Sequence, residues 1–336
     1  MKKKFLVIGA GIGGLSSAGY LKQSNEEFIV VEKSAQIPNN LSNGLHYLHD
    51  MQFNLPFKME FKECVLTENI WDTKTNTFSK SAMIPELFSY SKKVMDNLRH
   101  PSSIMDPGKR TCVFVPESND MNELIEKYTE YIGEENFQLN TTITRIDREN
   151  KIAQYQILGD DRIHHIEYDH IITTAPLNIF QNMVGLQMVD DDGRSSLKFK
   201  PIYITNYEAK NVVPNWLLVL YMADPKFPPY RITCFNNIIS MESLMELTHD
   251  DEVIIKYLVG DLFDYDLSSS QKYKWETGRI FGVTKDQRKM MIQKLSEDCI
   301  YPIGRFATWD GKLLMNTTIR QSEEIIKSIL FKQYAV

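Results

Sequence analysis

Residues 4–15, KFLVIGAGIGGL, give the strongest indication of the fold. Its first part is a short apolar run, typical of a buried strand, and glycines follow at Gly9, Gly11 and Gly14. Such glycines permit a tight turn, let a pyrophosphate approach the backbone, and let the following helix pack against the strand. The helix that we expect over 15–23 would point its free N–H groups and positive dipole end at the phosphates.

A second predicted strand, FIVVE at residues 28–32, ends in Glu32, whose carboxylate can accept both hydroxyls of an adenosine ribose. The order of strand, glycines, helix, strand and acid favours a dinucleotide site over a glycine-rich turn that binds nothing. An acid at this position disfavours a 2′-phosphate, so NAD and FAD remain as cofactors. The contacts that we expect here are Gly9, Gly11, Ile12, Gly13, Gly14, Glu32 and Lys33.

The composition is that of a folded globular protein. Its 336 residues suffice for about two domains, and 43% hydrophobic with 24% charged residues argues against disorder. A net charge of -6 makes nucleic acid a poor ligand. Four separated cysteines without a CxxC pair are typical of reduced thiols in a cytoplasmic protein. The first apolar run is shorter than the ~20 residues that span a bilayer, so we expect no membrane association.

The remainder of the chain separates NAD from FAD, because it does not continue as a simple nicotinamide dehydrogenase. A polar loop at 33–43 and a long stretch of mixed character come first, and regular patterning returns only near 113–116. From there the sequence predicts a helix over 121–132 and then strands over 142–146, 152–158 and 169–176.

This order resembles that of two-domain flavoproteins of the amine oxidase and UDP-galactopyranose mutase-like superfamily, over residues 4 to about 330. Three segments resemble the mutases in particular: GLHYLH at 44–49, PYRIT at 229–233 and YPIGRFATW at 301–309. The resemblance implies an α/β fold, in which a Rossmann-type FAD/NAD(P)-binding domain is joined to a discontinuous substrate domain of antiparallel sheet plus helices. It implies FAD as the cofactor.

The predicted division of the chain is discontinuous. We expect the FAD-binding domain at 1–50, 110–176 and 285–336, and the substrate-binding domain at 51–109 and 177–284.

Two residues are candidates for chemistry on the substrate side. His46 is either a loop histidine packed against an aromatic ring or an imidazole that faces the flavin. With His49 it makes only two histidines, too few for a metal site, so we expect no metal. Arg231 either closes a salt bridge or clamps an anion with its planar fork. The resemblance implies that this anion is the diphosphate of a nucleotide sugar.

The carboxy-terminal segment supplies the other candidates. Gly304 indicates close approach of the backbone to a cofactor, and Arg305 is expected to reach the flavin or its pyrophosphate. Asn316 or Thr317 is predicted to cap the last helix, whose amino end would stabilise negative charge on a reduced flavin. The remaining predicted cofactor contacts are Gly44, Ile143 (by its backbone, from the resemblance), Thr174 and Thr318.

The leading functional hypothesis is a redox-neutral rearrangement of a nucleotide sugar, with reduced flavin as nucleophile. His46 would orient, Arg231 would clamp and Arg305 would support the reduced ring. The alternative is an amine-oxidase-like oxidoreductase acting on a small molecule, and a third reading is a flavin-binding protein without turnover. We expect the substrate to be a small molecule. For the assembly of the protein, a homo-oligomer is the default expectation.

Overall fold

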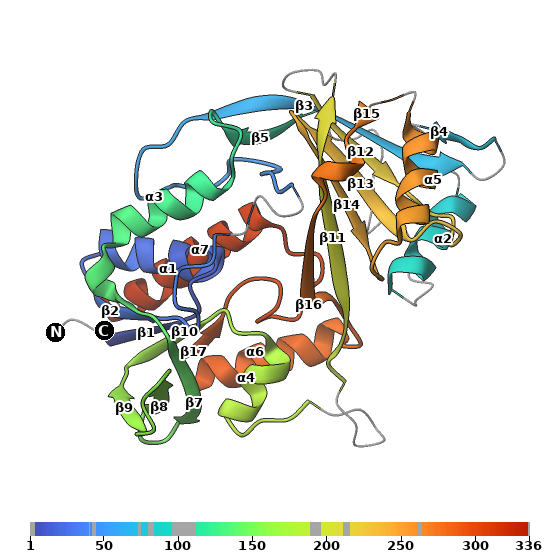
Figure 1. The fold of residues 1–336 in the computed structure, drawn as a ribbon. Helices are drawn as coiled ribbons and strands as arrows, with labels where there is room; N and C mark the ends of the chain where they lie inside the picture. Colours follow the sequence, from blue (N-terminus) through green and yellow to red (C-terminus); the bar gives the residue numbers. More distant parts are fainter. Residues whose placement is uncertain are drawn as a thin grey trace.

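The computed structural model describes residues 4–39, 41, 45–72, 75–79, 84–95, 112–188, 196–210, 216–260, 262 and 264–334. A parallel sheet of five strands lies beside a larger, mostly antiparallel sheet of nine (Figure 1). In order across the parallel sheet, its strands are β17 (Ile300–Pro302), β10 (His170–Thr173), β1 (Lys4–Ile8), β2 (Glu27–Val31) and β6 (Phe137–Gln138).

Both faces of the parallel sheet are buried, which is why its strands are almost entirely apolar. Successive side chains of β1 point to opposite faces: Phe5 and Val7 belong to one core, Leu6 and Ile8 to the other. The first core is shared with α1 (Ile12–Gln23), α3 (Asn122–Ile132) and α7 (Met315–Tyr334). The second is shared with α4 (Leu177–Met183), α6 (Lys285–Glu297) and a three-stranded sheet of β7 (Thr141–Asp147), β8 (Ile152–Ile157) and β9 (His164–Glu167).

The large sheet stands on the other side of the molecule (Figure 1). Its strands are β3 (Phe61–Asp72), β4 (Thr77–Ser79), β5 (Cys112–Pro116), β11 (Lys198–Lys210), β12 (Trp216–Tyr221), β13 (Pro229–Phe235), β14 (Ile238–Ser243), β15 (Asp264–Tyr265) and β16 (Gln271–Phe281). One face packs against α2 (Ile84–Met95) and the residues around Leu45. The opposite face is covered by α5 (His249–Val259).

The predicted strands and helices of the parallel part agree with the structure to within a few residues. The two-unit division of the chain stays a prediction, and three segments bear on its boundaries. β5 pairs with β3 of the large sheet, which a boundary at 110 did not anticipate. Apolar residues of 51–59 pack on the core of α1, α3 and α7, and α4 packs beneath the parallel sheet. None of the helices within the described residues is long and apolar enough to cross a membrane.

Candidate cofactor and substrate site

The predicted cofactor residues come from distant parts of the chain and meet at one edge of the parallel sheet. Because β1, β2, β10 and β17 are parallel, their carboxyl ends lie at the same edge. Gly9 follows β1, Glu32 follows β2, Thr174 follows β10 and Gly304 lies just beyond β17. Dinucleotides bind in the crevice outside such strand ends.

Two glycines of the first turn are required by its geometry. A Cβ atom on Gly14 would lie 1.9 Å from the carbonyl oxygen of Gly9, so only glycine lets α1 approach the end of β1 this closely. Gly9 itself has a φ of +94°, and a Cβ there would lie 2.4 Å from Oγ1 of Thr174. These two positions therefore serve packing and chain reversal, as predicted.

Gly11 is different, because a Cβ on it would meet no atom within 4 Å. It is the N-cap of α1, and no side chain caps the helix there, so no side-chain oxygen occupies the helix end. Open space and uncapped N–H groups at a helix amino terminus fit the pyrophosphate of a dinucleotide.

Glu32 is buried and braces the turn. Its Oε2 atom accepts the N–H of Ala10 at 2.8 Å, and its Oε1 atom accepts the N–H of Ser34 at 3.0 Å. These bonds fix the carboxylate between the glycine turn and the segment after β2, where it can still accept from a ribose through its remaining lone pairs.

Gly13 is the point at which three other segments meet the glycine turn. A Cβ on Gly13 would lie 3.1–3.2 Å from side-chain carbons of Thr174, Ile303 and Thr318. The Thr174 hydroxyl donates to the carbonyl of Ile8 at 3.0 Å, and the Thr318 hydroxyl donates to that of Leu314 at 3.0 Å. Both threonine hydroxyls thus hold neighbouring backbone.

The predicted capping of the last helix is wrong. α7 begins at Met315, so Asn316 and Thr317 lie in its first turn. Asn316 Nδ2 instead donates to Asp50 at 2.7 Å, while its buried Oδ1 has no hydrogen-bond partner within the described part of the chain. An unpartnered buried acceptor at this helix start would suit a hydrogen-bond donor of a bound cofactor.

Four other predicted cofactor residues carry less information. Ile12 is partly buried in the core beside α1, and Lys33 is exposed. The Ile143 side chain is buried in the core below the parallel sheet, and its strand has a bulge between Ile143 and Arg145. Gly44 lies outside the described residues.

The structure agrees with one of the two readings of His46, a loop histidine packed against an aromatic ring, and the flavin-facing reading stays a prediction. The His46 ring stacks on Trp275 with centroids 5.7 Å apart, and its Nδ1 lies 2.7 Å from the carbonyl of Leu41. Because a carbonyl can only accept, Nδ1 carries the proton and Nε2 is left as the acceptor. Burial lowers the pKa of His46, which favours this neutral form, while nearby Glu242 opposes the shift and Arg231 adds to it.

A bulge in β13 shapes the surroundings of Arg231. Pro229 pairs with Ser243, and Arg231 pairs with Glu242. The paired residues are thus two positions apart on β13 but only one position apart on β14. Two successive side chains, Tyr230 and Arg231, therefore reach the same carboxylate. Tyr230 donates its hydroxyl to Glu242 Oε2 at 2.5 Å, and Arg231 donates Nε to Oε1 at 2.9 Å and Nη2 to the same atom.

Glu242 is thus an internal counter-ion. Burial alone raises its pKa, but the guanidiniums of Arg231 and Arg279 outweigh burial and the pKa falls below its usual value. The salt-bridge reading of Arg231 is confirmed, and one edge of its fork is committed to Glu242 in this structure.

Arg279 is a residue that the sequence did not single out. Its guanidinium carbon lies 4.5 Å from the ring centroid of Tyr230, and its buried Nε has no hydrogen-bond partner within the described residues. It follows Gly278, where a Cβ would lie 2.3 Å from Ile202, so β16 approaches β11 too closely for a side chain. A single arginine after a glycine is too common in sequences to be recognised as a site.

Arg305 joins this group from the segment after β17. It donates Nε and Nη2 to the carbonyl of Leu313 at 3.0 and 2.9 Å. Burial, and then the positive charges of Arg279 and Arg231, lower the pKa of Arg305 to about 10. The mutual effect of these charges shows that the three arginines share one region, next to His46.

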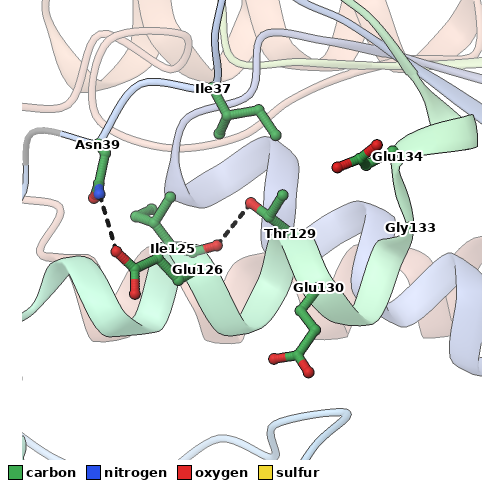
Figure 2. Close-up of a pocket in the computed structure, with 8 residues that line it drawn as sticks. All are labelled: Ile37, Asn39, Ile125, Glu126, Thr129, Glu130, Gly133 and Glu134. Atoms are coloured by element: carbon green, nitrogen blue, oxygen red, sulfur yellow. Dashed lines mark hydrogen bonds between the residues drawn. The ribbon is translucent and has the colours of Figure 1, made fainter.

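A separate pocket of about 590 Å³ lies on the outer side of α3. Figure 2 shows Ile37 and Ile125 beside it, with Asn39 donating to Glu126. Two more carboxylates, Glu130 and Glu134, complete its acidic lining. This lining does not suit a phosphate, so we do not place the cofactor there.

No protein-family model and no curated protein sequence matches the chain. Solved structures do match its fold. The structure described as "Crystal structure of reduced UDP-Galactopyranose mutase" is 14% identical, with a TM-score of 0.73 over 98% of this chain and 94% of that chain. A putrescine oxidase bound to putrescine is 10% identical, with a TM-score of 0.61 over 98% and 99%. A CLA-producing fatty acid isomerase from P. acnes is 12% identical, with a TM-score of 0.59 over 97% and 98%.

These likenesses confirm the predicted fold class. The chain has the α/β architecture of these structures, in which a Rossmann-type parallel sheet with its helices is combined with a large, mostly antiparallel sheet and helices.

Proposed function

We propose that this chain is an FAD-dependent enzyme that rearranges the sugar ring of a nucleotide sugar, in the manner of a UDP-galactopyranose mutase. The fold and the open space at Gly11 support FAD. The observation that carries the choice of substrate is the Arg279 guanidinium, whose buried Nε has no partner within the described residues and lies beside two further arginines.

The charge of this cluster supports a diphosphate. Among the described residues, the three arginines outnumber the two nearby carboxylates, Glu242 and Glu68, so the cluster has a net positive charge, since His46 is neutral. A diphosphate that links two groups carries two negative charges and would pair with this positive charge. Without an anion, the buried positive charge is unfavourable, because charges in protein interiors are normally paired.

The three arginines would offer different guanidinium nitrogens to the diphosphate. Arg231 and Arg305 use Nε and Nη2 for Glu242 and for the Leu313 carbonyl, and their Nη1 atoms have no hydrogen-bond partner within the described residues. The buried Nε of Arg279 likewise has no partner there, so we propose Arg279 as the principal clamp, a change from the prediction that Arg231 plays this role.

When bound, FAD supplies the nucleophilic or electron-transfer chemistry of the reaction. Neutral His46, with its Nδ1–H held by Leu41, presents Nε2 as an acceptor that can orient a hydroxyl. Gly9 to Gly14 and Glu32 would hold the adenosine diphosphate half of the cofactor.

The amine-oxidase alternative is disfavoured by the same charges. A protonated amine would have to approach three guanidiniums that the carboxylates of Glu242 and Glu68 only partly neutralise.

The first test measures the binding of UDP and UDP-galactose to the flavin-loaded protein by titration calorimetry. The second test measures conversion of the sugar ring of UDP-galactose under reducing conditions. Arg279→Ala should weaken UDP binding about 10- to 100-fold, because a hydrogen bond to a charged group contributes roughly 1.5–3 kcal/mol. Arg279→Lys should be intermediate, since it keeps the charge and loses the fork.

Lys274→Ala is the matched control, because Lys274 is an exposed cation on the same strand. It should leave UDP affinity nearly unchanged. Wild-type protein that binds no UDP, or bleaching of its flavin by an amine, would contradict the proposal.

A further inference from the structure

The ammonium group of Lys93, on α2, is surrounded by backbone carbonyl oxygens, and it has no role in the proposed function. Four backbone carbonyl oxygens lie within hydrogen-bond distance of its nitrogen: those of Met222 at 3.0 Å, Asp224 at 2.9 Å, Pro229 at 2.7 Å, and Phe227. The side chain reaches them from a helix far away in sequence, so the contact is purely tertiary.

Four carbonyl oxygens around one positive centre form an unusual site for a lysine. An ammonium group has three hydrogens, so four acceptors exceed what its directed bonds can serve. Rings of backbone carbonyls are instead how proteins replace the hydration shell of a monovalent cation. We call these four oxygens, of residues 222, 224, 227 and 229, the carbonyl cage.

The carbonyl cage lies directly before the substrate side of the molecule. Three of its residues lie in the turn between β12 and β13, and Pro229 is the first residue of β13. The bond from the Met222 N–H to the Tyr230 carbonyl closes this turn at 2.9 Å. Tyr230 and Arg231 follow at once. On α2, Tyr90 lies about one turn before Lys93, and its ring contacts those of Tyr221 and Tyr230 at 5.4 and 6.5 Å between centroids.

We propose that Lys93 in its ammonium form is a tethered monovalent cation, and that the carbonyl cage is a binding site for K⁺ or ammonium that this side chain occupies. Its charge holds α2 against the turn and so positions the β13 bulge that carries Tyr230 and Arg231. The proposal does not rest on the identity of the cofactor or of the substrate.

The charges around Lys93 set the conditions for a test. Burial lowers the pKa of Lys93 to about 7, and the carboxylate of Asp224 acts in the opposite direction. Measurements below neutral pH therefore compare the ammonium form of the wild type with its variants.

Lys93→Ala empties the cage and should lower the Tm by about 3–8 °C, since it removes the ammonium from four carbonyl oxygens, of which that of Asp224 still accepts the Phe227 N–H at 3.3 Å. Added KCl or NH₄Cl should restore at least half of this loss in a saturable way, whereas choline chloride at equal ionic strength should not. Amide hydrogen exchange over 222–235, followed by mass spectrometry, should accelerate in the variant and slow again with K⁺.

Lys92→Ala is the matched control, because Lys92 is the exposed neighbour on the same helix. It should show neither the loss nor any cation-specific recovery. Equal recovery by choline, or none by K⁺ and ammonium, would overturn the tethered-cation proposal.

A second measurement covers the case in which Lys93→Ala does not fold. Competitive acetylation of the wild type should modify Lys93 at least tenfold more slowly than Lys92. Equal rates would mean that the carbonyl cage does not hold the ammonium, and would refute the proposal without any variant.

Discussion

The glycine turn allows one prediction that separates folding from cofactor binding. Gly11 and Gly14 are three residues apart, yet an added methyl group meets opposite surroundings. At Gly11 it enters open space, and at Gly14 it would lie 1.9 Å from the Gly9 carbonyl oxygen. If the space at Gly11 belongs to a pyrophosphate, Gly11→Ala should spare the fold and damage FAD binding, while Gly14→Ala should damage the fold itself.

The magnitudes follow from the local geometry. Gly11 has φ −74° and ψ 177°, which alanine adopts freely, so the lower entropy of the unfolded chain stabilises by about 0.4–1 kcal/mol. Alanine is a poorer N-cap than glycine by roughly 0.5–1 kcal/mol, so these effects nearly cancel. A methyl group against a bound pyrophosphate should cost about 1–3 kcal/mol, which is about 5- to 150-fold in FAD affinity.

Gly14→Ala forces α1 away from β1 and should destabilise the apoprotein by about 2–4 kcal/mol. The assays are urea unfolding of the apoprotein and FAD titration by flavin fluorescence. Gly311→Ala is the control, because its Cβ would make only ordinary contacts at 3.5 Å or more. Unchanged FAD affinity in a stably folded Gly11→Ala protein would refute the assignment of this turn to the pyrophosphate.

Three further predictions concern buried polar groups. Glu32→Gln removes one of two acceptors for backbone N–H groups, so urea unfolding should show a loss of about 1–3 kcal/mol and FAD titration a weaker complex. Burial lowers the pKa of His46 in the folded protein. Its contribution to the free energy of unfolding is therefore present above the unfolded pKa of about 6.5 and is lost as the pH falls through the lower folded pKa. Urea unfolding at several pH values should show that His46→Gln reduces this pH-dependent loss of stability. Burial raises the pKa of Glu323, but its bonds to Asn54 and Lys327 outweigh burial and lower it. Glu323→Gln should therefore speed limited proteolysis near Asn54 at neutral pH, and the difference from wild type should vanish as the pH falls through the folded pKa.

The Rossmann-type part of the fold was predictable from the sequence. Its signal is local: the glycines, Glu32 and the apolar strands lie within about thirty consecutive residues, and backbone sterics fix what each does. The other parallel strands were predictable because strands buried on both faces are continuously apolar.

The cluster of Arg231, Arg279 and Arg305 arises only in the tertiary structure. Arg231 was visible in the sequence, but Glu242 occupies half of its fork because a bulge in β13 turns Tyr230 and Arg231 to the same carboxylate. Arg279 gains its importance only from the neighbours that the sheet places around it.

The same distinction explains the wrong helix cap and the unforeseen lysine. Asn316 is a residue type that often caps helices, but α7 begins one residue earlier, at Met315. The side-chain amide of Asn316 donates a hydrogen bond to Asp50 instead. The four carbonyl oxygens around Lys93 carry no sequence signal, since every residue has a carbonyl. Local pattern fixes a turn because its partners are adjacent in the chain, whereas a cluster of buried charges exists only once distant strands and helices have packed together.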